Sequence, residues 1–254
     1  MNSIPYYYND QQMEEIETFI ADKFGEGGGY VIHELTSEYV HTDVSFATTP
    51  DGKRAFVTYG MGARTMQTPK GDKRVELCLC ATSDIEMMSE QSALISSELV
   101  RLSKYPFKND SWFGTGHTIN ASDEFKKEFG YDCFAFSEST ISAKLSDLDE
   151  EINFLFLVPI YKEERDWCIN NSTLALLEEL HDLYDGKEFD LDFKREMLIP
   201  NDIDSDEIDT YNLLAYLNID WDTYYRLGEY IDEMEKKGIE VDFQDIEEWV
   251  KKNK

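Results

Sequence analysis

Basic side chains are scarce in this chain, which has 24 Lys and Arg residues against 53 Asp and Glu residues. The formal net charge is −29, and the isoelectric point of the sequence is about 4.3. A potential of this sign repels phosphate backbones, so it disfavours nucleic-acid binding, whereas it attracts basic proteins and accelerates their encounter. Charge of this size also serves solubility or a salt-rich habitat, so it does not by itself identify a partner.

Cysteine is also rare, and its positions follow no metal-ligand or redox spacing. Cys78, Cys80, Cys133 and Cys168 include no Cys-x-x-Cys pair. Cys78 and Cys80 lie two residues apart in an alternating segment, so we expect both on one face of a strand. Neighbouring positions on one face are poorly placed for a disulfide. We therefore expect free thiols.

Long apolar runs are missing as well. No stretch of about 18 apolar residues occurs, and the first residues lack a basic region followed by an apolar core. We therefore expect a cytoplasmic protein without a membrane partner.

The chain lacks the short motifs of common catalytic and cofactor sites. It has no Gly-x-Ser-x-Gly elbow and no His-Glu-x-x-His pair. Residues 25–29 are rich in glycine, but they follow a predicted helix and precede a predicted strand, the reverse of a phosphate-binding loop, and no Lys-Ser/Thr pair follows. We therefore expect neither a cofactor nor catalysis.

The hydrophobic pattern predicts an α+β fold, with a mixed, largely antiparallel sheet and flanking helices. Turn chemistry at residues 50–52 and 69–72 favours an antiparallel meander, and the near-continuous apolar run of residues 152–160 predicts a strand buried on both faces. The expected strands are 30–35, 39–48, 55–61, 75–82, 131–136 and 152–160. The expected helices are 10–24 with Asp10 as N-cap, 89–105 ended by the breaker Pro106, 163–167 and 172–184.

The chain changes character after residue 200. Acidic clusters accompany apolar residues at helical spacing, with turn signals near Asn218 and Gly238. We therefore expect residues 1–200 to form the main domain and residues 201–254 a small acidic helical extension.

Two glycines mark the most unusual segment, Trp-Phe-Gly-Thr-Gly-His-Thr at residues 112–118. Gly114 and Gly116 bracket one residue, and glycines so placed let the backbone pass where a Cβ would clash. Trp112 and Phe113 are core residues by default, and either becomes an interface anchor if it is exposed.

Histidine offers the one set of candidate metal ligands. His41 and Asp43 share a strand face, and together with His117 they could converge as metal ligands or as an acid/base pair of a metal-dependent enzyme. His-x-Asp spacing recurs by chance, so a hydrogen-bonded structural pair of His41 and Asp43 is the favoured interpretation. Glu163 and Glu164 begin a predicted helix, where the helix dipole accounts for both.

Six separated motifs in order resemble the Suppressor of fused domain, over roughly residues 31–180. They are His41-Thr42-Asp43-Val44, Tyr59-Gly60-Met61 followed by Met66, Glu76-Leu77, Tyr105-Pro106-Phe107, Trp112 to Ile119, and Leu157-Val158-Pro159-Ile160-Tyr161-Lys162-Glu163-Glu164.

The resemblance implies an α+β domain that binds proteins. Animal members grip an extended peptide of a transcription factor between this domain and a second lobe. Nothing after Pro200 resembles that lobe, so the two-lobed clamp is not carried over. Bacterial single-domain members, which this chain resembles in length and acidity, are expected to be immunity proteins of polymorphic toxin systems.

We therefore expect an immunity protein that covers a basic toxin domain with a carboxylate-rich surface. The alternative is a peptide-binding adaptor, in which an extended ligand adds to a strand edge near residues 112–117. The oligomeric state and the identity of the toxin stay open. The candidate acidic residues are Asp202, Asp204, Asp206, Glu207 and Asp209 after the main domain, and Asp147, Asp149, Glu150 and Glu151 within it.

Overall fold

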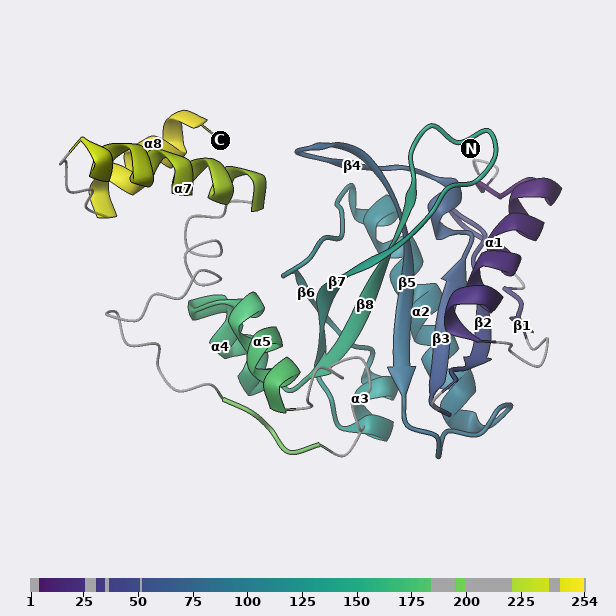
Figure 1. The fold of residues 1–254 in the computed structure, drawn as a ribbon. Coiled ribbons are helices and arrows are strands. Elements are labelled where there is room, and N and C mark those ends of the chain that lie inside the picture. The colour runs from purple at the N-terminus through teal and green to yellow at the C-terminus, as the bar shows by residue number, and fades with distance from the viewer. Residues whose placement is uncertain are drawn as a thin grey trace.

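One mixed sheet organises the computed structural model, which describes residues 5–25, 31–34, 37–50, 52–183, 195–199, 221–237 and 243–253. The strand order is β1-β2-β3-β5-β8-β7-β6, and β4 pairs with the first part of β5 (Figure 1). Neighbouring strands run antiparallel except β5 and β8, which are parallel. The strands are β1 (Val31–Ile32), β2 (Asp43–Thr48), β3 (Arg54–Tyr59), β4 (Met66–Thr68), β5 (Gly71–Ala81), β6 (Thr118–Asn120), β7 (Cys133–Ala143) and β8 (Ile152–Ile160).

Helices cover both faces of this sheet. Helix α1 lies against one face and α2 against the opposite face (Figure 1). The helices are α1 (Asp10–Phe24), the short 3-10 turn η1 (Met61–Ala63), α2 (Glu90–Asn109), α3 (Asp123–Phe129), α4 (Lys162–Asn170), α5 (Thr173–Leu183), α7 (Trp221–Lys236) and α8 (Phe243–Asn253). None of the helices in the described ranges is both long and apolar enough to cross a membrane.

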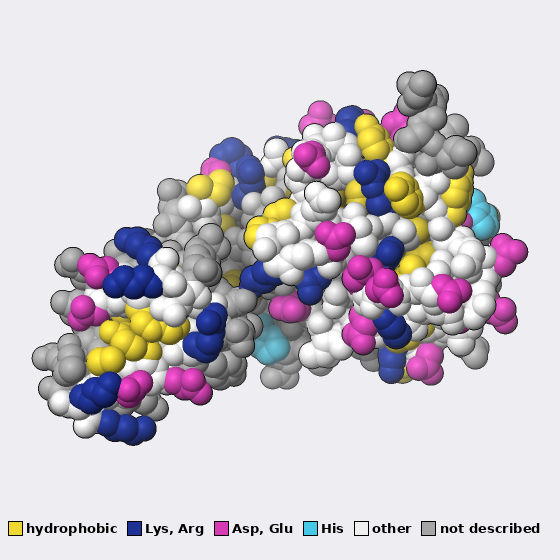
Figure 2. Space-filling view, turned by 90° about the horizontal axis from the view of Figure 1, so that it is seen from above, with side chains coloured by type: hydrophobic (Ala, Val, Ile, Leu, Met, Phe, Trp, Pro, Cys, Tyr) yellow, Lys and Arg dark blue, Asp and Glu magenta, His cyan; other side chains and the backbone are white. Residues whose placement is uncertain are grey.

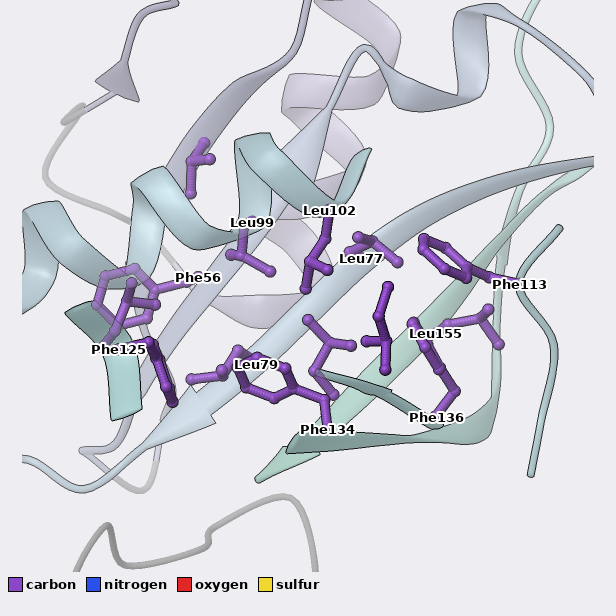
Figure 3. Packing of buried hydrophobic residues seen from close by; sticks show 14 of the residues in the cluster. Phe56, Leu77, Leu79, Leu99, Leu102, Phe113, Phe125, Phe134, Phe136 and Leu155 are labelled. Carbon is purple, nitrogen blue, oxygen red and sulfur yellow. The ribbon is translucent and has the colours of Figure 1, made fainter. Parts of the chain in front are cut away.

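Alternation along β5 divides the core in two. Leu77 and Leu79 face α2, whereas Cys78 and Cys80 face α1, as the spacing of the cysteines predicts. On the α2 side, Leu99 and Leu102 point toward the sheet, and Phe113 closes one end of the cluster beside Phe136 (Figure 3). All four cysteines are buried free thiols.

The predicted architecture is confirmed, and β8 has the predicted bounds and is buried on both faces. The helix expected to stop at Pro106 instead continues to Asn109. Pro106 cannot donate to the carbonyl of Leu102, but the helix continues for three residues beyond it, and the Pro106 carbonyl accepts from the backbone N–H of Ser111 at 2.9 Å. Its C-cap Asp110 adopts the left-handed conformation, which ends the helix.

The start of α1 also differs from the prediction, because Asn9 and not Asp10 is the N-cap. The Asn9 side chain accepts from the backbone N–H of Gln12 at 2.9 Å, and the Gln12 side chain accepts from the backbone N–H of Asn9 at 3.1 Å. This reciprocal capping box needs the glutamine three residues after the cap, which Asp10 does not have.

Four short elements, η1, β4, β6 and α3, were not predicted. The strands expected at 30–35 and 39–48 are shorter than predicted, because Glu38 and Val40 form a bridge around Tyr39, whose φ is 65°. Residues beyond 200 are described only from 221, where α7 and α8 pack together through buried Leu227 and Val250. The domain boundary at residue 200 stays a prediction.

Candidate functional site

The carboxylate of Asp43 is the centre of a buried polar network at the start of β2. It accepts from the backbone N–H of Glu34 at 2.9 Å, and its oxygens lie 2.8 Å from His33 Nδ1 and 3.3 Å from His41 Nε2. The pair of His41 and Asp43 that the spacing predicts is therefore present. His33, ten residues before Asp43, is a third member that sequence reasoning missed.

Glu34 extends this network to helix α2. Its side chain is 5% exposed, accepts from the backbone N–H of Thr42 at 3.1 Å and forms an ion pair with Lys104. Ser37 links the two halves, because its Oγ lies 2.6 Å from His41 Nδ1 and 3.2 Å from a Glu34 oxygen. The network holds the segment before β2 against α2, which is a structural role.

His117 belongs to a different environment. Its ring centroid lies 4.3 Å from that of Trp112, and burial lowers the pKa of its imidazole, opposed by a hydrogen bond with the Trp112 backbone. No group of three or more His, Cys, Asp or Glu side chains in the described ranges could hold a metal ion. His41, Asp43 and His117 therefore do not form the metal site that the sequence allowed.

The two glycines of residues 112–118 are favoured for different reasons, Gly114 by a close approach and Gly116 by its backbone conformation. A Cβ on Gly114 would lie 2.5 Å from a ring carbon of Trp112, and Gly116 has a φ of 80°. Gly116 N–H donates to the Phe136 carbonyl at 2.9 Å, which sets the segment along the end of β7. Trp112, half-buried, remains an anchor candidate.

Phe113 is a core residue and not an interface anchor. It is 5% exposed and stacks on Phe136 at 4.4 Å and on Tyr105 at 5.8 Å between ring centroids. The ring therefore fixes residues 112–118 to the α2-side core and makes no contact with solvent that a partner could use.

Glu164 forms a buried ion pair, in addition to the interaction with the helix dipole that the sequence predicts. Its carboxylate is fully buried and receives two hydrogen bonds from Arg195, at 2.5 and 2.6 Å, while the backbone N–H groups of Tyr161 and Leu198 donate at 2.8 and 2.7 Å. Tyr161 Oη donates to the Arg195 carbonyl at 2.5 Å. Glu163 is exposed, so the dipole still accounts for it.

Glu76 is a second buried carboxylate, within the motif of residues 76–77. Its oxygens accept from Tyr8 Oη at 2.8 Å, Thr58 Oγ1 at 2.6 Å, and the backbone N–H groups of Gly60 and Gly62 at 2.8 and 2.9 Å. Both glycines are required, because a Cβ on Gly60 would lie 2.0 Å from a carbonyl oxygen and one on Gly62 would lie 2.4 Å from the Tyr8 hydroxyl.

The acidic residues predicted within the main domain lie in the connection between β7 and β8. Asp147 and Asp149 are exposed, whereas Glu150 pairs with Arg74 at 3.0 Å and Glu151 accepts from Ser142 at 3.0 Å. The five predicted acidic residues between 202 and 209 lie outside the described residues.

Helix α1 contributes further exposed carboxylates, and it is joined to the connection that carries Asp147 and Asp149. Ser146 donates from its backbone to Glu15 at 2.6 Å, and its carbonyl accepts from Gln12 at 2.9 Å, so the connection is fastened to α1. We name five of the exposed carboxylates of these two segments the α1 acidic surface. It comprises Asp10, Glu14, Glu17, Asp147 and Asp149. On the face seen in Figure 2, acidic and basic side chains are interspersed, so the negative charge is distributed over several areas.

Three of the four cysteines are weak nucleophiles. Burial raises the pKa of Cys133 to about 11 and that of Cys168 to about 12, and it also raises the pKa of Cys78 well above its ordinary value. A thiol of this kind stays protonated near neutral pH and reacts slowly.

The described residues therefore form an α+β domain in which buried carboxylates fasten neighbouring segments, with acidic and partly exposed aromatic side chains at the surface. The family model described as Suppressor of fused protein (SUFU) matches residues 38–196. The match spans more than half of the chain, which therefore belongs to the Suppressor of fused family.

Solved structures of this family share the fold. A SUFU homologue from Neisseria gonorrhoeae matches with a TM-score of 0.52 and 16% identity, covering 76% of this chain and 98% of the homologue. A chain of the Sufu–Fu complex matches with a TM-score of 0.56 and 10% identity, covering 76% and 93%. Drosophila Suppressor of Fused matches with a TM-score of 0.57 and 10% identity, and here 76% of this chain covers 51% of the fly protein.

These identities are low, so the structures establish the fold. In the Sufu–Fu complex, a protein of this fold is assembled with another protein. The comparison with curated proteins found no match.

Proposed function

We propose that this protein acts by binding another protein, as an immunity protein that neutralises a cognate bacterial toxin by covering a basic surface of it. Membership of the Suppressor of fused family supports a binding role, since a relative is seen in a protein complex. The observation that carries the choice of a basic partner is the excess of 53 acidic over 24 basic side chains.

The α1 acidic surface is the described region best suited to this contact. Glu14 and Glu17 are exposed on α1, and neither makes an ion pair with a described residue. Asp147 and Asp149 are exposed on the connection that Ser146 fastens to α1. Carboxylates arranged this way attract a cationic substrate cleft and then occupy it.

Reversing charge on α1 is expected to slow the association. The double change Glu14→Lys and Glu17→Lys should lower the association rate constant by about tenfold at low salt, because steering depends on the local field. The partner for this test is the product of the adjacent reading frame, if it encodes a secretion leader and a variable C-terminal domain. Stopped-flow fluorescence over a series of salt concentrations measures the rate.

The matched control makes the same change of charge elsewhere. Glu86 precedes α2 and Glu124 lies on α3, and both are exposed. Lysines at these two positions should slow the association clearly less than the α1 pair does. A rate that is independent of ionic strength, or equal effects of the two double variants, would contradict capture by the α1 acidic surface.

A peptide-binding adaptor is the second candidate, and the edge position of β6 favours it. The His117 carbonyl and the Ala121 N–H bond to β7, so the alternation of an antiparallel ladder turns the backbone groups of Thr118 outward. Arg101 already donates to the Asn120 carbonyl at 3.0 Å, which leaves Thr118 as the open position. Strand addition here would use few backbone bonds.

Replacing Thr118 with Pro tests this alternative. The change removes the outward N–H, so affinity for a peptide selected on an array should fall at least tenfold, while the ladder with β7 is kept. Thr118→Val is the control, because it keeps the N–H and loses the hydroxyl that accepts from Arg165 at 3.5 Å. Fluorescence anisotropy measures both affinities, and retained affinity in the proline variant would exclude strand addition at β6.

A further inference from the structure

Arg64 has no anionic partner among the described residues of this strongly acidic protein. It follows η1, and its guanidinium carbon lies 5.2 Å from the ring centroid of Tyr6 and 4.8 Å from that of Phe107. Among the described residues, its side chain makes no ion pair and no hydrogen bond. Two aromatic rings therefore hold the cation, and its N–H donors remain available.

The other arginines of the chain differ in this respect. Each of them donates to at least one oxygen, in most cases a carboxylate or a backbone carbonyl. Those residues are Arg54, Arg74, Arg101, Arg165, Arg195 and Arg226. The sequence has 53 carboxylates, and Arg64 forms an ion pair with none of those that are described. The fold contacts its guanidinium through two rings but leaves the N–H donors without a hydrogen-bond acceptor in the described part of the chain.

The groups around Arg64 are fixed by the fold. Tyr6 is held in extended conformation, because its N–H donates to the Tyr39 carbonyl at 3.1 Å and its carbonyl accepts from His41 N–H at 2.9 Å. Phe107 belongs to α2 and packs against the core. The guanidinium is therefore positioned before any partner arrives, which lowers the entropy lost on binding.

The segment that contains Tyr6 carries exposed aromatic side chains. Tyr6 is 53% exposed and Tyr7 is 54% exposed, and the Tyr7 ring lies 5.7 Å from that of His41. Tyrosine and arginine are the residue types most enriched among the energetically dominant positions of protein interfaces. Arg64 and its neighbour Tyr6 are therefore of the residue types that anchor protein interfaces.

We propose that Arg64, held by Tyr6 and Phe107, binds an Asp or Glu side chain of a protein partner. A guanidinium offers a planar fork of donors that matches a carboxylate, and the pair is strongest where aromatic groups exclude water. A polyphosphate such as nucleic acid does not fit, because the net charge of −29 repels it.

This inference rests on the protein-binding function proposed above and adds a specific contact to it. A partner that is basic overall is drawn by the acidic surface, whereas one carboxylate placed on Arg64 fixes the orientation of the bound partner. An ion pair between Arg64 and a carboxylate of the partner contributes specificity as well as affinity.

Parallel selection of peptides on the unaltered protein and on one variant tests the proposal. A phage-displayed library of random short peptides is selected on the unaltered protein and on Arg64→Gln. The unaltered protein should select sequences with Asp or Glu at one fixed position next to apolar residues, and Arg64→Gln should not. Selection of no acidic position on the unaltered protein, or of the same acidic position on both proteins, would overturn the proposal.

A double-mutant cycle then measures the contact. In a selected peptide, replacing the acidic residue with its amide should weaken binding about tenfold to the unaltered protein and less than twofold to Arg64→Gln. Arg64→Lys keeps the charge without the fork and should recover only part of the affinity. Equal losses on all three proteins would contradict the proposal. Because the probes are defined peptides, this result is independent of whether the toxin association is found.

Discussion

Replacing Arg195 with Met is expected to lower the free energy of unfolding by about 3–5 kcal/mol, because the change leaves the carboxylate of Glu164 buried without its cation. Both side chains are 0% exposed, and the pair is bidentate at 2.5 and 2.6 Å. Arg195 also donates to the Pro159 carbonyl at 3.0 Å, so it joins residues 195–199 to the end of β8. Urea denaturation followed by circular dichroism measures the loss.

An exposed ion pair on the same helix gives the control. Lys162 pairs with Asp166 four residues later, and both side chains are about half exposed or more. Lys162→Met should leave the denaturation midpoint close to that of the unaltered protein, since solvent screens such pairs. Combining Arg195→Met with Glu164→Leu should recover part of the loss, because the unpaired charge is then removed. An Arg195→Met variant as stable as Lys162→Met would show that the buried pair does not hold this segment.

The long periodic elements could be predicted from the sequence, because one strong signal specified each of them. The apolar run of residues 152–160 is such a signal, and β8 has those bounds. The parallel pairing of β5 and β8 had no local signal, since strand direction depends on the path of residues 82–151 between them. Strand β6 has three residues, too few for a period to be visible.

The candidate site was predictable only where the partners are close in sequence. His41 and Asp43 are two residues apart, and their pairing follows from strand geometry. Glu164 is 31 residues from Arg195, and nothing local in the sequence joins them. The two ring contacts of Arg64 come from two segments that are far from it in sequence, so its position between the rings could be found only in the folded chain.

Glu76→Leu is expected to lower the free energy of unfolding by at least about 3 kcal/mol, because it removes the acceptor of four buried donors at once. Those donors are the hydroxyls of Tyr8 and Thr58 and the backbone N–H groups of Gly60 and Gly62. Glu76→Gln is the matched variant. Its carbonyl can serve the three donors that meet at Oε1, and its amide can donate to the Thr58 hydroxyl. The glutamine variant should therefore lose much less than the leucine variant in urea denaturation, and equal losses would contradict this account.

The dependence of stability on pH distinguishes the two charge states of Glu76. Burial raises the pKa of this carboxyl, and the hydrogen bonds from its four donors oppose the rise without cancelling it. Between the ordinary pKa of glutamate and this raised value, the folded chain binds more protons than the unfolded chain, so its stability falls as pH increases. The free energy of unfolding of the unaltered protein, measured relative to that of Glu76→Gln, should therefore be highest at low pH and should fall toward neutral pH. Denaturation of both proteins across a pH series measures it, and a difference that grows with pH would show that the donors outweigh burial and lower the pKa.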